Sequence, residues 1–159
     1  MKTEHFEFIQ FDYNDNNHIK LERDIINSDY SNLISRDIDT FIKRNLMFSK
    51  DNNITNVYVI NYENNLIGLA FVNFHKEEII DGKHYDDEIE IGCGLHPDYI
   101  GKHLGNLIEY ELADIELKLH PEFSCIVARI DDDNIRSIKA ATKAGFIHSQ
   151  DDEYIFKRR

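Results

Sequence analysis

The chain has 159 residues and a formal net charge of −12 at pH 7. This length suits one domain with a buried core, expected to span residues 1–159, and the acidic balance argues against a nucleic-acid partner, because neutralising phosphates requires a basic face. No apolar run reaches the ~18 residues of a membrane-spanning helix, so no membrane partner is expected.

The first part of the chain predicts a strand followed by two helices. Residues 3–11 alternate loosely between apolar and polar side chains, as a strand does, and residues 12–17 are turn formers. Residues 18–49 carry apolar side chains at helical spacing, and the polar stretch 28–31 divides them into two helices.

The middle part predicts three strands. Residues 54–62 and 66–74 are rich in β-branched and aromatic side chains and are joined by Glu-Asn-Asn, which indicates a hairpin. We expect residues 77–87 to form a polar loop that leads into a strand over residues 88–95.

The last part alternates helices and strands. A helix that Pro121 closes would carry on one face Leu104, Leu107, Ile108, Leu112, Ile115 and Leu119. It is followed by a buried strand (124–130), a helix (134–144) that ends at Gly145, and a strand pair (146–150 and 153–159). This order predicts a mixed sheet with helices on its faces, of class α/β or α+β.

Cysteine and histidine usage indicates the compartment and the metal content. Cys93 and Cys125 are not clustered, and the N-terminus lacks the basic-then-apolar pattern of a secretory signal, which favours reduced thiols in a cytoplasmic protein. Since the 8 histidines are scattered, no metal site is expected.

Four of the 7 glycines fall within residues 90–105, at positions 92, 94, 101 and 105. The spacing fits neither a G-x-G-x-x-G dinucleotide fingerprint nor a P-loop. A turn that follows a strand and points its backbone N–H groups into the start of a helix can instead bind a pyrophosphate. The alternative is an ordinary strand-to-helix connection with glycines for tight packing.

Three motifs in this order resemble the GNAT superfamily of N-acetyltransferases. They are residues 95–105 (LHPDYIGKHLG), the pair Asn134 and Ser137, and residues 143–146 (KAGF). Within the superfamily, the chain is most similar to the branch that acetylates protein N-terminal amines and polyamines.

The resemblance implies a mixed, mostly antiparallel central sheet flanked by helices on both faces. It implies an acyl-CoA-dependent N-acetyltransferase, with acetyl-CoA as co-substrate and no metal, in which a primary amine attacks the thioester directly. The acceptor would be a protein N-terminal amine, a polyamine or another small amine. A non-catalytic acyl-CoA-binding or regulatory module on the same fold is the alternative.

The resemblance also assigns the residues that hold the cofactor. The pantetheine arm would pair with the backbone of Cys93, Gly94 and Leu95. Asn134 and Ser137 would bind the arm from the other side. The pyrophosphate would lie on Ile100, Gly101, Lys102, His103, Leu104 and Gly105.

The chain departs from the family pattern at three positions. Ile100 replaces the usual Gln or Arg, His103 replaces a glycine, and Ala141 replaces the tyrosine that protonates the leaving thiolate in many relatives. We expect a side chain at position 103 to be tolerated only with a negative φ.

Removing a proton from the acceptor amine requires a base, since alkyl amines have pKa values near ~10.4. Glu90, which opens the EIG pattern of relatives, is the first candidate and Glu88, on the same strand face, the second; the alternatives are that Glu90 binds the amine, or that both lie on a solvated face. We expect Cys93 to be inert packing.

A cationic acceptor could be attracted by Asp24, Asp29, Asp86, Asp87 and Glu88. An exposed edge strand such as 153–159 would invite pairing, so a homodimer stays open.

Overall fold

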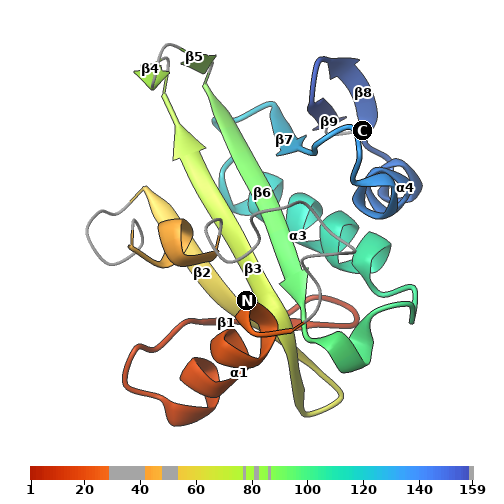
Figure 1. The fold of residues 1–159 in the computed structure, drawn as a ribbon. Coiled ribbons are helices and arrows are strands. Elements are labelled where there is room, and N and C mark those ends of the chain that lie inside the picture. Colours follow the sequence, from red (N-terminus) through yellow and green to blue (C-terminus); the bar gives the residue numbers. More distant parts are fainter. Residues whose placement is uncertain (29–41, 48–53, 77, 81–82, 86, 158–159) are drawn as a thin grey trace.

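The computed structural model describes residues 1–28, 42–47, 54–76, 78–80, 83–85 and 87–157. Its main sheet consists of β1 (Glu7–Gln10), β2 (Thr55–Tyr62), β3 (Asn65–His75), β6 (Glu88–Leu95), β7 (Cys125–Arg129), β8 (Ile147–Gln150) and β9 (Glu153–Lys157). The strand order is β1-β2-β3-β6-β7-β9-β8 (Figure 1). Among the described strands, only β6 and β7 pair in parallel. The expected mixed, mostly antiparallel sheet is confirmed.

Helices cover both faces of this sheet (Figure 1). On one face lie α1 (Asn16–Ile26) and the helical residues 42–47, whose apolar side chains form a core with Leu69 and Phe71 of β3. On the other face lie α3 (Gly105–Leu119) and α4 (Ile135–Ala144), which form a second core with apolar residues of β6 and β7. None of the helices in the described part of the chain is long and apolar enough to cross a membrane.

Local sequence signals explain several element boundaries. Asp15 caps α1 by accepting a hydrogen bond from the backbone N–H of Asn17 (2.7 Å). Glu63 and Asn64 both have positive φ (50° and 64°), the conformation of a two-residue hairpin turn whose twist suits β2 and β3. Gly145 ends α4 in the left-handed conformation (φ 101°). The predicted hairpin and the predicted stop of this helix are confirmed.

Two predictions about strands are wrong. Residues 77–87 were expected to form a loop, but β4 (Glu78–Ile80) and β5 (Lys83–Tyr85) pair as antiparallel strands, because backbone pairing does not require an apolar pattern. Residues 77, 81–82 and 86 lie outside the described residues. The strand β9 was expected to be an exposed edge, but it lies between β7 and β8, so β8 forms the edge. The start of the second predicted helix lies outside the described residues.

The buried face of α3 differs from the prediction for an apolar side chain and for two acidic side chains. Ile108 and Leu112 are buried as expected, but Leu119, the last residue of the helix, is 54% exposed. Glu111 and Glu116 are buried instead. Apolar spacing alone could not predict that these two carboxylates are buried, because the residues that bury them come together only in the folded chain.

Candidate functional site

The strands β6 and β7 pair only at their beginnings. Ile89 pairs with Ile126 and Glu90 with Val127, after which β6 continues to Leu95 alone on that side. On its other side β6 pairs with β3 along its whole length. In the described pairings, residues 91–95 therefore offer the backbone of an open strand edge.

The connection from β6 to α3 has an unusual backbone. After the short 3-10 helix η2 (Pro97–Tyr99), Gly101 and His103 both have positive φ (75° and 60°). The expectation of a negative φ at position 103 is therefore wrong: His103 adopts the left-handed conformation that glycine adopts without strain. The turn therefore has a positive φ at position 103 although His103 carries a Cβ atom.

The N-terminus of α3 has no side-chain cap. Leu104 occupies the cap position, and its carbonyl accepts hydrogen bonds from the N–H groups of Leu107 and Ile108 (3.1 and 3.0 Å). The uncapped start of a helix presents backbone N–H groups and the positive end of the helix dipole, which together favour an anion.

A cavity of about 320 Å³ lies between the open edge of β6, this turn, and the facing sides of α3 and α4. Among the residues predicted to hold the cofactor, it is lined by Cys93, Leu95, Ile100, Gly101, His103, Leu104, Gly105 and Ser137. The structure thus brings most of the predicted cofactor residues to one place.

Three predicted cofactor residues do not line this cavity. Gly94 alternates with Cys93 and Leu95, so it belongs to the opposite face of β6. The ammonium group of Lys102 lies 4.7 Å from the centre of the Tyr99 ring. The side-chain oxygen of Asn134 caps α4 by accepting a hydrogen bond from the N–H of Ser137 (3.2 Å).

Sequence reasoning missed several lining residues, among them three cations of α4. Arg136, Lys139 and Lys143 line the cavity from one face of the helix. Their spacing, three and then four residues, was a signal in the sequence that could have found them. In a chain with a net charge of −12, a cavity edged by three cations is a local reversal of charge that suits phosphate groups.

Glu109 of α3 was also missed, although it lines the cavity. Its Oε2 atom is buried and has no hydrogen-bond partner among the described residues. Burial raises the pKa of Glu109 to about 8. The pKa of Cys93, which lines the same cavity, is also raised, by burial and then by the charge of Glu109, so its thiol stays protonated at neutral pH.

The predicted catalytic residues lie elsewhere, in a cluster around Arg129. Its guanidinium group makes ion pairs with Glu88 (2.6 Å), Glu90 (2.8 Å) and Glu153 (2.9 Å). The Nε2 atom of His75 lies 3.1 Å from Glu90. Glu88 and Glu90 share one face of β6, as predicted, and Glu90 is the last β6 residue that pairs with β7. Neither lies on a solvated face, since the side chains of Glu88 and Glu90 are 8% and 19% exposed.

Burial and charge act differently on these two carboxylates. Burial raises the pKa of Glu88, and Arg129 only partly offsets this effect. Burial also acts to raise the pKa of Glu90, but the hydrogen bond with His75 and the charge of Arg129 outweigh it and hold the pKa below its usual value. Glu90 is therefore an ionised carboxylate at neutral pH.

The acidic residues expected to attract a cationic acceptor are dispersed. Asp24 pairs with Lys20 (2.6 Å) and lies 3.7 Å from His96, and the hydrogen bond from Lys20 is the main cause of its lowered pKa. Asp87 is exposed. Asp29 and Asp86 lie outside the described residues.

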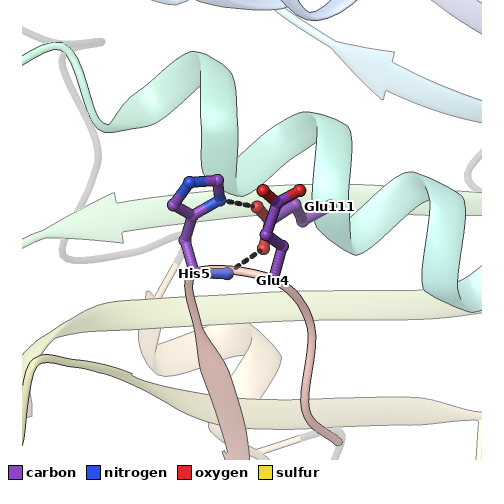
Figure 2. A group of neighbouring side chains, drawn as sticks. All are labelled: Glu4, His5 and Glu111. Atoms are coloured by element: carbon purple, nitrogen blue, oxygen red, sulfur yellow. Dashed lines mark hydrogen bonds and ion pairs between the residues drawn. The ribbon is translucent and has the colours of Figure 1, made fainter.

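Among the described residues, two groups of titratable side chains have atoms close enough together to share an ion: His75 with Glu88 and Glu90, and Glu4 with His5 and Glu111. In the first group, Arg129 already occupies both carboxylates. Figure 2 shows the second group, where the ring and the backbone N–H of His5 point toward Glu111. The hydroxyl of Thr3 also donates to Glu111, which fastens the N-terminal segment to α3.

Comparison with known proteins identifies the family. The family model described as the acetyltransferase (GNAT) domain matches residues 12–147. No curated protein matches the sequence.

Solved structures share the fold at low sequence identity. A crystal structure of aminoglycoside acetyltransferase AAC(6')-Ib with coenzyme A and kanamycin has a TM-score of 0.71 and 16% identity, over 97% of this chain and 94% of that chain. The N-acetyltransferase PseH of Campylobacter jejuni, with acetyl coenzyme A, has a TM-score of 0.63 and 15% identity, over 97% and 99%. An aminoglycoside N(6')acetyltransferase of Legionella pneumophila has a TM-score of 0.65 and 16% identity, over 98% and 92%.

Proposed function

The chain belongs to the GNAT acetyltransferase family, and on that premise we propose that it is an N-acetyltransferase that moves an acetyl group from acetyl-CoA to a primary amine. The observation that carries the proposal is the cavity between the open edge of β6, the uncapped start of α3 and the cations of α4. Family relatives with the same fold have been crystallised with coenzyme A or acetyl-CoA.

The residues that line the cavity fit the two chemical parts of this co-substrate. The N–H groups at the start of α3, with Arg136, Lys139 and Lys143, suit its phosphate groups. The open edge of β6 suits the amides of its pantetheine arm, which can pair with a strand backbone. When bound, acetyl-CoA supplies the thioester, whose acetyl carbon forms the new amide bond as the bond to sulfur breaks.

The acceptor amine would approach from the other face of the sheet, where Glu90 stands at the point at which β6 and β7 separate. Three carboxylates surround one guanidinium there, so the cluster favours a cation. We assign Glu90 to holding the ammonium group and receiving its proton, directly or through water, with Glu88 as the second candidate. A protein N-terminal amine or a polyamine fits this role, and so does another small amine.

Departure of the thiolate is not assisted by a tyrosine at the position where many relatives carry one. Ala141 stands at that position and is fully buried. Because a thiol has a pKa of only ~8.5, its thiolate leaves without a proton donor at neutral pH.

Cys93 and Cys125 are both free thiols, which supports a reducing, cytoplasmic location. A homodimer through the exposed edge strand β8 is also proposed.

The first test is calorimetric titration with acetyl-CoA of the wild type, Gly105→Ala and Gly105→Glu. A Cβ atom at position 105 would lie 3.5 Å from the Cβ of Ala140, an ordinary contact, so the alanine control should fold and bind. A glutamate at the start of a helix is compatible with the helix dipole, but it would place a negative charge where the phosphates bind, and binding should fall at least tenfold. Absence of binding by the wild type would refute the proposal.

The second test separates the enzyme from a non-catalytic acyl-CoA-binding module, which the absent tyrosine and the ion-paired Glu90 favour. Thiol release from acetyl-CoA is measured with a panel of N-terminal peptides, polyamines and aminoglycosides. Turnover that Glu90→Gln reduces at least tenfold supports the enzyme and the role of Glu90. Binding of acetyl-CoA without turnover on any amine supports the module.

A further inference from the structure

Glu109 lines the proposed cofactor cavity. It lies on the second turn of α3, and its buried Oε2 accepts no hydrogen bond from any described residue. Glu111 on the same helix differs, because it accepts hydrogen bonds from Thr3 and His5. Leaving a buried carboxyl oxygen without a hydrogen bond is unfavourable, so its presence in a cavity points to a ligand that supplies the missing bond.

The carboxyl group of Glu109 lies near the β6 side of the cavity, because its charge contributes to the raised pKa of Cys93. Cations of α4 (Arg136, Lys139 and Lys143) line it together with His103, but no described cation forms an ion pair with Glu109. The neighbours on the β6 side are Cys93, whose thiol is uncharged, and Leu95. Glu109 therefore lies beside the uncharged thiol at the open strand edge of β6, where the pantetheine arm is proposed to bind.

We propose that Glu109 is a further cofactor-binding residue, whose carboxyl group pairs with an amide of the pantetheine arm of acyl-CoA. This inference rests on the proposed function. A neutral carboxyl has one O–H donor and one carbonyl acceptor, and a secondary amide has one carbonyl acceptor and one N–H donor, so the two groups match. An ionised carboxylate would only accept hydrogen bonds, and it would repel the phosphates of the same ligand.

The protonation state of Glu109 should make the affinity for acetyl-CoA depend on pH. Burial raises the pKa of Glu109 to about 8, so the neutral form prevails at pH 7. Above pH 8 the group must first take up a proton before it can pair, and affinity for acetyl-CoA should fall by up to tenfold per pH unit. The other titratable groups that line the cavity are Cys93, Tyr99, His103, Arg136, Lys139 and Lys143.

The test compares acetyl-CoA with adenosine 3′,5′-bisphosphate, which carries phosphates but no pantetheine arm, by calorimetry at pH 7, 8 and 9. Glu109→Leu should weaken acetyl-CoA binding at pH 7 about 5- to 10-fold and leave the bisphosphate unchanged. The amide of Glu109→Gln still offers an N–H donor beside a carbonyl acceptor, so this variant should bind acetyl-CoA like the wild type at pH 7 and lose the fall above pH 8. Asp114→Asn, at a half-buried carboxylate of the same helix that pairs with Lys118 and does not line the cavity, is the matched control and should bind both ligands like the wild type.

Three outcomes would overturn the proposal: Glu109→Leu weakens both ligands equally, it weakens neither, or Glu109→Gln keeps the pH dependence of the wild type. In each, acetyl-CoA binding by the wild type leaves the proposed function intact. A wild type that binds neither ligand would overturn both. Since the Oε2 of Glu109 has no partner in the described structure, both variants should fold at least as stably as the wild type, which urea titration checks.

Discussion

Replacing Arg129 by Met should destabilise the protein strongly and in a pH-dependent way. At the observed distances of 2.6–2.9 Å and an effective dielectric constant of about 20, each ion pair of Arg129 is worth roughly 6 kcal/mol before desolvation. After desolvation, removing one partner of a buried pair costs about 3–5 kcal/mol, because the other charge stays buried. We expect a loss in this range in the free energy of unfolding at pH 8.

The pH dependence identifies the cause of the loss. In the wild type, the lowered pKa of Glu90 stabilises the fold above its unfolded pKa of about 4.5, and this stabilisation disappears as the pH falls through the folded value. Without Arg129, burial would raise the pKa of Glu88 and Glu90, so protonation at low pH would relieve the buried charge.

Urea titrations at pH 5 and pH 8 should therefore show a smaller loss for Arg129→Met at pH 5. Arg23→Met, at an exposed arginine of α1, is the control and should change stability by less than about 0.5 kcal/mol. A loss below about 1 kcal/mol at pH 8, or an equal loss at both pH values, would refute the reasoning.

Three other substitutions test single features of the structure. His103→Gly should raise the free energy of unfolding by about 0.5–1 kcal/mol in urea, because the left-handed conformation strains a residue with a Cβ atom, whereas Lys102→Gly should not. Burial raises the pKa of Glu116 to about 7, so the wild type loses stability as the pH rises from 4.5 through 7. Glu116→Gln should therefore stabilise by about 2–3 kcal/mol at pH 8 and by less at pH 5, and an equal gain at both would contradict this. The hydrogen bond with Glu111 raises the pKa of His5, so its contribution is complete below pH 6.5 and disappears as the pH rises through the raised value. His5→Ala should lower the Tm at pH 6 more than at pH 9.

The sequence predicted the parts of the site that local rules govern. A strand, a glycine-bearing turn and a helix follow one another in residues 88–119, so their adjacency in space needs no knowledge of the rest of the chain. Gly101 and Gly145 adopt the left-handed conformation, so the backbone geometry at these positions explains why the sequence has glycine there. His103 shows the limit of this rule, because the turn keeps a positive φ without a glycine.

The parts that were missed depend on the register of distant segments. Arg129 meets Glu90 and Glu153 because β7 lies between β6 and β9, a pairing that no local pattern contains. The cavity that Glu109 lines likewise forms only when α4 packs beside α3. In an acidic sequence a carboxylate is expected to be exposed. The few buried carboxylates could therefore not be distinguished from the exposed ones before the fold was known.

The separation of β6 from β7 explains why one strand can serve two substrates. Alternate residues of a strand point to opposite faces, so Cys93 and Leu95 face the cavity while Glu90 faces the other side. In a continuous sheet the two faces would be isolated from each other by the paired backbone. Because the described pairing with β7 stops at Glu90, the backbone of β6 is unpaired on that side beyond this residue, and under the proposed function a thioester held there would meet an amine held by Glu90. The short pairing is therefore as much a part of the proposed active site as any side chain.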